Sequence, residues 1–319
     1  MVANARGSSV WAGCAARCPR PMALPCPLPA PSKAMRTRHL LPVLGLILAT
    51  LPGCDHIDDP TPPTTGNGGP DTSQQVVRKV LLEDITGHRC NNCPRAARIA
   101  QSLKEDLFGE NLILVGVHAG GFAAPYAPIG DGFYDSDHRT AAGTTYQQTY
   151  GVSFFPAGLV SRRSFQNSVV VSEGSWGSAV AEIAGQPSPF DLRILNSTVQ
   201  GGDISAEVRV RFVNDVQGDH RIVVYLVEDH VVDWQLDSEA TPPDVEDYDH
   251  RHMLRANLNG TWGETLISGS AAAGDSVTIT TPAFGLNPAW NTSNLYIVAW
   301  IYDAATEEVM QAEERKHQP

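Results

Sequence analysis

Two cysteines separated by two residues constrain this chain more than any other feature of its sequence. In "GHRCNNCPRAARIAQSL", residues 87–103, Cys90 and Cys93 are followed by Pro94 and a run of apolar residues at helical spacing. Proline is tolerated in the first turn of a helix, so a helix begins at or near the second cysteine. Such a pair is a redox dithiol, a structural disulfide or half of a metal site, and its surroundings must decide which.

The segments on either side of the cysteine pair predict an α/β region. Residues 76–85 are apolar and β-branched, as expected of a buried strand. Residues 93–108 carry apolar side chains at helical spacing, and "NLILVGVHA", residues 111–119, indicates a second buried strand. The order strand, helix, strand predicts a βαβ unit with a right-handed crossover.

The pattern changes after Pro189, where short strand-like runs follow one another without a long helical pattern. "DISAEVRVRFV", residues 203–213, alternates apolar and polar side chains. The further strand candidates are "RIVVYLVED" (221–229), "DSVTITTP" (275–282) and "NLYIVAWIYD" (294–303). The sequence therefore predicts an α/β domain over residues 76–186 and an antiparallel, immunoglobulin-like β-sandwich over residues 187–319.

The N-terminal region predicts export and a lipid anchor. Within "RTRHLLPVLGLILATLPGC", residues 36–54, two arginines precede an apolar run that is too short to span a bilayer and typical of a signal-peptide core. The small residues before Cys54 resemble the lipobox of bacterial lipoproteins. Residues 35–53 are therefore predicted to be a lipoprotein signal peptide, with lipidation of Cys54 attaching the chain to a membrane. The alternative is an ordinary secretory signal followed by a chance cysteine.

Two segments flanking this signal are not expected to form a core. Residues 1–34 are rich in Pro, Ala and Cys, without periodicity, and are interpreted as an over-called start or a disordered leader. Residues 54–75 are Pro-, Gly-, Thr- and Asp-rich and are predicted to be a flexible tether behind the lipidated cysteine. The net charge of −12 argues against a nucleic-acid partner.

The position of each cysteine suggests a role in thiol–disulfide exchange. An exported compartment permits disulfides. Free N–H groups and the helix dipole at a helix N-terminus favour the thiolate of Cys90, and Cys93 lies behind it as a resolving thiol. Asp84, six positions before Cys90, is placed to sit beneath the pair and to move protons from Cys93. In "YGVSFFPAGLV", residues 150–160, Pro156 resembles the cis-proline that packs against the dithiol in thioredoxins.

Residues 76–186 thus resemble a thioredoxin-like domain, with two departures. Arg89 stands before the first cysteine instead of tryptophan, and Asn91-Asn92 replaces Gly-Pro between the cysteines. The segment 118–149 is longer than usual and is expected to cover the dithiol.

The chain as a whole resembles the family named after a 28-kilodalton outer membrane protein of Bacteroidetes-type bacteria. The resemblance rests on the lipobox, the Pro-rich tether, "EDITGHRCNNCPRAARIA", "VGVHAGGFAAP", "HRTAAG", "YGVSFFPAGLVSRR", "YLVEDHVVDWQ" and "DYDHRHMLRANLNGTWGE". It implies a lipid-anchored protein of the cell outer membrane, with a thioredoxin-like domain and a β-rich C-terminal domain. The family is named for its location, and the resemblance implies no activity.

Metal binding is the least favoured reading of the cysteine pair. A zinc site normally has four ligands, and the mature chain has no second cysteine pair. His88, His118 and His138 show no ligand spacing, and "DYDHRH", residues 247–252, is read as an acidic loop that carries histidines. The sequence therefore predicts neither a metal nor a cofactor.

Two functions remain. The first is an envelope thiol–disulfide oxidoreductase that exchanges disulfides with protein thiols or disulfides. The second is a non-catalytic surface lipoprotein that uses the thioredoxin-like fold as a scaffold and binds a partner through its β-domain. The first requires a sulfur of Cys90 that solvent can reach, and the second does not.

Overall fold

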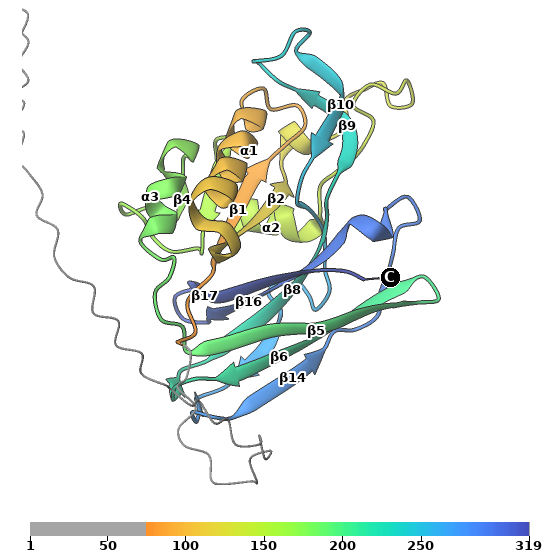
Figure 1. Ribbon diagram of the computed structural model, residues 1–319. Helices are drawn as coiled ribbons and strands as arrows, with labels where there is room; N and C mark the ends of the chain where they lie inside the picture. The colour runs from red at the N-terminus through yellow and green to blue at the C-terminus, as the bar shows by residue number, and fades with distance from the viewer. Residues whose placement is uncertain (1–74, 319) are drawn as a thin grey trace, which may run out of the picture. The chain divides into compact units, whose positions relative to one another are not determined.

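The computed structural model describes residues 75–318, which build a mixed α/β fold dominated by strands (Figure 1). A nine-stranded sheet forms its centre. In spatial order its strands are β17 (Val309–Lys316), β16 (Leu295–Asp303), β8 (His220–Glu228), β11 (Met253–Asn257), β2 (Leu112–His118), β1 (Val80–Thr86), β3 (Ala157–Val160) and β4 (Val170–Val171), with β12 (Glu264–Ile267) paired to β8.

The predicted βαβ unit is present in the first part of this sheet. Strands β1 and β2 are parallel, and the helix α1 (Cys93–Ser102) joins them, continued by η1 (Leu103–Phe108) and η2 (Gly109–Asn111). Strand β1 begins at Val80, later than the predicted residue 76, because Val77 makes only an isolated bridge to Pro187. Strand β3 pairs antiparallel with the other edge of β1.

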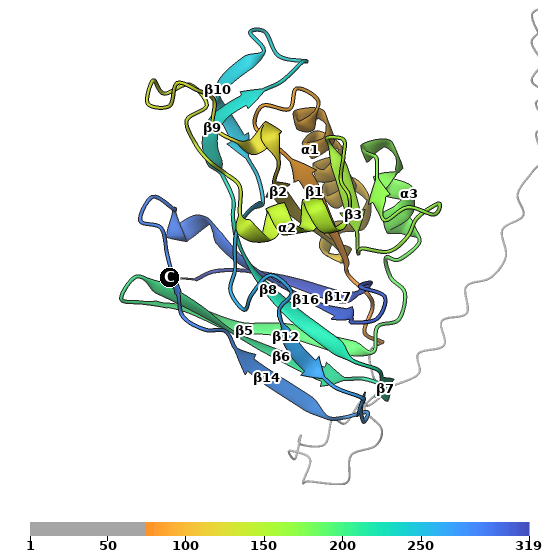
Figure 2. The same ribbon diagram turned by 180° about the vertical axis from the view of Figure 1, so that it is seen from behind.

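Helices cover both faces of this part of the sheet (Figures 1 and 2). On one face, apolar side chains of α1 and α3 (Trp176–Ala181) share a core with β1 and β2. On the other face, α2 (Ala141–Thr149) contributes Ala142 and Tyr146 to a second core. Three short 3-10 turns complete the helical structure: η3 (Gly121–Ala123), η4 (Glu173–Ser175) and η5 (Thr292–Asn294).

A four-stranded antiparallel sheet forms a further layer. It contains β5 (Phe190–Gln200), β6 (Asp203–Phe212), β14 (Ser276–Thr280) and β15 (Phe284–Gly285). The alternation predicted for β6 is confirmed, since Ile204, Ala206, Val208, Val210 and Phe212 are all buried. These side chains share a core with β8 and β16 of the large sheet. A small pair, β7 (Val216–Gln217) with β13 (Ser270–Ala271), lies outside both sheets.

Strands β8 and β16 are buried on both faces, which explains why their sequences read as continuous apolar runs. In β8, Val223, Tyr225 and Val227 face the core beneath α2. The alternate residues Ile222, Val224 and Leu226 face the four-stranded sheet. The same strand therefore belongs to two cores, and its pattern lacks the alternation of β6.

The predicted division between residues 186 and 187 does not divide the large sheet. Strands β1 to β4 lie before this point in the sequence, and β8, β11, β12, β16 and β17 lie after it. Strand β11 joins the two groups, because Met253 pairs with Gly116 of β2 and with Glu228 of β8. The described residues 75–318 accordingly belong to one compact unit.

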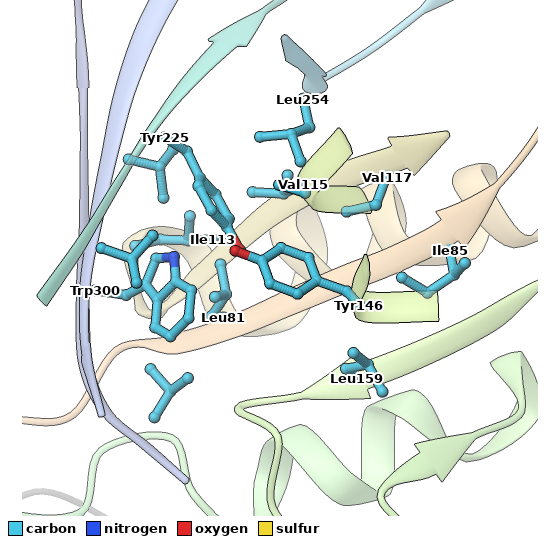
Figure 3. Packing of buried hydrophobic residues seen from close by; sticks show 14 of the residues in the cluster. Leu81, Ile85, Ile113, Val115, Val117, Tyr146, Leu159, Tyr225, Leu254 and Trp300 are labelled. Atoms are coloured by element: carbon cyan, nitrogen blue, oxygen red, sulfur yellow. The ribbon is translucent and has the colours of Figure 1, made fainter. Parts of the chain in front are cut away.

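A buried core extends across this junction (Figure 3). Tyr146 of α2 points toward Tyr225 of β8, and Trp300 of β16 packs beside them. The guanidinium of Arg162 lies 4.3 Å from the ring centres of both Tyr146 and Trp300. Arg162 also forms an ion pair with Glu83 of β1, so charged groups and aromatic rings join the two parts of the sheet.

A β-hairpin projects from the C-terminal part of the chain past the start of α1 (Figures 1 and 2). It consists of β9 (Val231–Leu236) and β10 (Asp244–His250), which pair only with each other. Within residues 75–318, no helix is long and apolar enough to cross a membrane.

Candidate functional site

Cys90 and Cys93 form a disulfide in the turn between β1 and α1. The helix begins at Cys93, and Asn92 is its N-cap residue. Cys90 therefore lies two residues before the cap, close to the N-terminus of the helix. The backbone N–H of Cys93 donates to the carbonyl oxygen of Cys90 at 3.2 Å, which closes the turn around the disulfide. Pro94 occupies the second helical position, where no intrahelical donor is required.

Both cysteines are covered. Cys90 is 3% exposed and Cys93 is 1% exposed. The loop after β2 lies against the cysteine turn, because the N–H of Arg89 donates to the carbonyl oxygen of Phe122 at 2.9 Å. A Cβ on Gly87 would lie 2.6 Å from the backbone carbonyl carbon of Phe122, so only glycine permits this approach.

The hairpin β9–β10 also lies against the turn, and no local pattern in the sequence predicts this contact. Strand β9 and the residues after it run along the cysteine turn and bond to its backbone carbonyls. These bonds are Leu236 N–H to His88 at 2.8 Å, Ser238 N–H to Asn91 at 3.0 Å, and the Gln235 side-chain amide to Cys90 at 3.1 Å. These three bonds hold this edge of the hairpin against the cysteine turn.

Side chains outside the turn also hold the hairpin in place. Arg98 of α1 forms ion pairs with Asp237 at 2.9 Å and Glu239 at 2.5 Å. The side chain of Arg98 is 47% exposed, so solvent weakens these pairs and their contribution is modest. From the other side, the indole N–H of Trp234 donates to the carbonyl oxygen of Gly132 at 2.6 Å.

A cavity of about 360 Å³ lies beside the disulfide, between α1, β1, β2 and the end of the hairpin. Its lining combines apolar side chains with a few polar groups. The polar and sulfur-bearing residues relevant here are Asp84, Cys93, Arg98, His118, Tyr248 and His250. The cavity therefore brings the inner cysteine and Asp84 to one space, together with two histidines that are 132 residues apart in the sequence.

Asp84 lies within β1 and is 7% exposed. Its Oδ1 atom has no hydrogen-bond partner among the described residues. Burial raises the pKa of its carboxyl group from 3.8 to about 8, and the nearby charge of Glu173 adds to this rise. At neutral pH the group is mostly protonated, so it can accept and return a proton close to Cys93.

Pro156 lies directly before β3, which pairs with β1, the strand that leads into the cysteine turn. The Phe155–Pro156 peptide bond is cis. Ala157 pairs with Ile85, so Pro156 is at the same end of the ladder as the exit from β1. The ring of Phe155 packs against Phe122 at 5.5 Å between ring centres, which links this segment to the loop that covers Arg89.

Cys54 and the predicted signal peptide and tether lie outside the described residues. Lipidation of Cys54 therefore stays a prediction, and mass spectrometry of the mature N-terminus checks it. We expect a mature chain that begins at an acylated Cys54 and lacks residues 1–53. Recovery of peptides from residues 1–34 in protein purified from its native membrane would contradict this.

The structure is similar to solved structures of other proteins. HBP35 of Porphyromonas gingivalis is structurally similar with a TM-score of 0.54, over 76% of each chain and at 16% identity, which shows a likeness of fold alone. A domain of the outer membrane lipoprotein Omp28 from P. gingivalis matches 41% of this chain and 90% of its own length at 20% identity, and its TM-score of 0.28 is too low to support an argument. A comparison with curated proteins gives no match.

The family comparison covers the C-terminal part of the cysteine-bearing region and the strands that follow it. The family model for outer membrane protein Omp28 matches residues 143–318, which is more than half of the chain. This region includes Pro156, the covering hairpin and all strands from β3 to β17. The chain therefore belongs to the Omp28 family and is a protein of the outer membrane.

Proposed function

We propose that this outer membrane protein exchanges disulfides with protein partners through Cys90 and Cys93. A partner thiolate attacks one sulfur of the disulfide and forms a mixed disulfide, while the other sulfur leaves as a thiolate. A second partner thiol then attacks the mixed disulfide. The partner dithiol is thereby oxidised to a disulfide, and the Cys90–Cys93 pair is reduced to two thiols.

The observation that carries this proposal is the unpaired carboxyl of Asp84 beside Cys93. A buried carboxyl without a partner destabilises a fold, and a purely structural disulfide does not need one. Exchange does need a proton acceptor and donor near the inner sulfur, because Cys93 is deprotonated when it attacks and protonated when it is released. A carboxyl group whose pKa is about 8 can perform both transfers near neutral pH.

The arrangement of the strands supports the same interpretation. We interpret residues 76–186 as a thioredoxin-like domain, from the order β1, α1, β2 and β3, the cysteine turn at the start of α1 and Pro156 before β3. We interpret residues 187–319 as an immunoglobulin-like sandwich, from the four-stranded sheet that packs on β8 and β16. In this chain the hairpin β9–β10 is bonded to the turn, and we expect it to move away when a partner reacts.

The test is an insulin-reduction assay on the full chain, comparing wild type with Cys90→Ser. We expect the wild type to accelerate reduction and the variant to lose this acceleration. Exchange is reversible, and in the reducing direction Cys90 attacks a partner disulfide and Cys93 then releases the partner. Cys93→Ser is therefore expected to trap mixed disulfides, because the inner thiol that would release the partner is gone. Circular dichroism confirms that each variant is folded. Both proteins carry the same cysteines outside the pair, so any background from those is equal.

A second candidate is a non-catalytic surface protein in which the disulfide only braces the turn. Its specific support is the burial of both cysteines and the three hydrogen bonds from the hairpin to the turn. Under this reading the folded protein resists reduction by dithiothreitol, and Cys90→Ser reduces insulin at the wild-type rate. Equal rates would therefore remove the exchange function and leave the scaffold.

A further inference from the structure

Four histidines from separate parts of the chain meet beside the disulfide. His88 lies in the turn before Cys90, and His118 is the last residue of β2. His138 lies in the loop before α2, and His250 ends β10 of the covering hairpin. All four are buried, with exposed fractions between 1% and 6%. Their sequence spacing follows no ligand motif, so only the fold brings them together.

We propose that His118, His138 and His250 bind one divalent transition-metal ion of the kind that prefers imidazole, with Zn²⁺ as the representative. His88 is placed to be a fourth ligand. The proposal is independent of the exchange function, because it uses neither sulfur of the Cys90–Cys93 disulfide.

The spacing of the rings supports the proposal. The ring centres of His118, His138 and His250 form a triangle with sides of 5.3, 5.4 and 5.6 Å, and His88 lies 5.4 Å from His138. Imidazoles that bind one tetrahedral Zn²⁺ through nitrogens at about 2.0–2.1 Å have ring centres about 5 Å apart. Among residues 75–318, no group of three or more histidine, cysteine, aspartate or glutamate side chains is placed to hold a metal ion in the conformation of this structure. Binding therefore requires the rings to rotate about their side-chain bonds.

Most ring nitrogens of the cluster that are buried have no hydrogen-bond partner among the described residues, and so are available to an ion. These are both ring nitrogens of His118 and of His88, and Nε2 of His138. His138 Nε2 lies 3.0 Å from Oδ2 of Asp233 without a hydrogen bond between them, and His250 Nε2 lies 3.3 Å from the carbonyl oxygen of Trp234. A carboxylate or carbonyl oxygen near one ring nitrogen orients an imidazole, and the other ring nitrogen is then free to bind the ion.

The chemistry of the donor atoms agrees with this role. Nitrogen donors of this type suit zinc, copper and nickel better than magnesium or calcium.

The proposed ion has a structural consequence. His250 belongs to the hairpin, and Asp233, which orients His138, belongs to its other strand. His118 and His138 belong to the body of the protein. An ion bound by these residues therefore fastens the hairpin over the cysteine turn. We expect Zn²⁺ to slow the reduction of the disulfide by dithiothreitol, since binding to the closed form stabilises that form.

The direct test is calorimetric titration of the full chain with Zn²⁺ at neutral pH, with the disulfide kept oxidised. We expect His118→Gln and His250→Gln to weaken the histidine-dependent binding of Zn²⁺ at least about 100-fold. Loss of a residue that only orients a ligating histidine already lowers metal affinity about 10–100-fold. Asp233→Asn is expected to weaken it by that smaller factor. His230→Gln is the matched control, since His230 adjoins the same hairpin and its side chain is 52% exposed.

A second measurement separates the loss of a ligand from the loss of the fold. Co²⁺ bound by imidazoles in a tetrahedral site gives visible absorption, which we expect in the wild type and in Cys90→Ser/Cys93→Ser but not in His118→Gln. Circular dichroism confirms that the variants are folded. The proposal is overturned if folded His118→Gln and His250→Gln bind Zn²⁺ as tightly as the wild type, since the ion then binds elsewhere in the chain.

Discussion

Replacing Asp84 with asparagine is expected to stabilise the protein increasingly as the pH rises from about 4 to about 8. The carboxyl is buried in β1, and desolvation raises its pKa from 3.8 to about 8. Below pH 4 it is protonated in both the folded and the unfolded chain, so it adds no pH dependence. Between these values the unfolded chain releases the proton and the folded chain keeps it, so the free energy of unfolding falls as the pH rises.

The size of the effect follows from the change in pKa. One pKa unit corresponds to about 1.4 kcal/mol, so a rise of about four units lowers the free energy of unfolding by up to about 5 kcal/mol at pH 8. Asparagine cannot ionise and removes this loss. Urea unfolding of wild type and Asp84→Asn at several pH values measures the difference. Subtracting the free energy of unfolding of one protein from that of the other cancels the contribution of the buried histidines, which titrate in both.

Asp106→Asn is a suitable control, because Asp106 is exposed on η1 and its replacement is expected to leave the pH dependence unchanged. The same Asp84→Asn variant should slow disulfide exchange while it stabilises the fold. A variant that gains stability and loses exchange would show that the carboxyl serves the reaction at the expense of stability. Parallel stability curves for Asp84→Asn and wild type between pH 4 and pH 8 would contradict the raised pKa.

Replacing Arg162 with methionine is expected to lower the free energy of unfolding by about 3–5 kcal/mol, the usual cost of breaking a buried ion pair. Two guanidinium nitrogens of Arg162 donate to the two carboxylate oxygens of Glu83 at 2.8 Å each, and both side chains are fully buried. Tyr225 of β8 donates to the same carboxylate at 2.8 Å. Without the arginine, the carboxylate of Glu83 is left in the core without a charged partner.

Urea unfolding at constant pH measures this loss, and two further proteins interpret it. Arg139→Met breaks an exposed pair with Asp137 and should cost between about 0 and 1 kcal/mol. Glu83→Gln with Arg162→Met removes both charges and should recover part of the loss, because no buried charge remains unpaired. A loss for Arg162→Met no larger than that for Arg139→Met would show that the pair contributes little to joining the two parts of the sheet.

The local elements of this fold could be predicted from the sequence because their signals are local. The alternation of Ile204 to Phe212 predicts a strand with one buried face, and the apolar spacing after Cys93 predicts the helix that begins there. The position of Asp84 near the cysteine turn follows from strand and turn order alone. These inferences use residues within about ten positions of one another, over which backbone periodicity determines which side chains share a face. Pro156 lies 66 residues after Cys90, and its place near the turn was implied only by the resemblance to thioredoxins.

The arrangement around the disulfide was decided only by the tertiary structure. Met253 pairs with Gly116 across 137 residues, and Leu236 bonds to the carbonyl oxygen of His88 across 148 residues. No local period encodes such pairs, because they depend on which strand edges meet when the large sheet forms. The hairpin that covers the cysteines and the meeting of His118 with His250 both follow from that sheet. The sequence by itself determined the helices and strands and the cysteine chemistry available to the chain. The pairing of distant strands decided which residues surround the two cysteines.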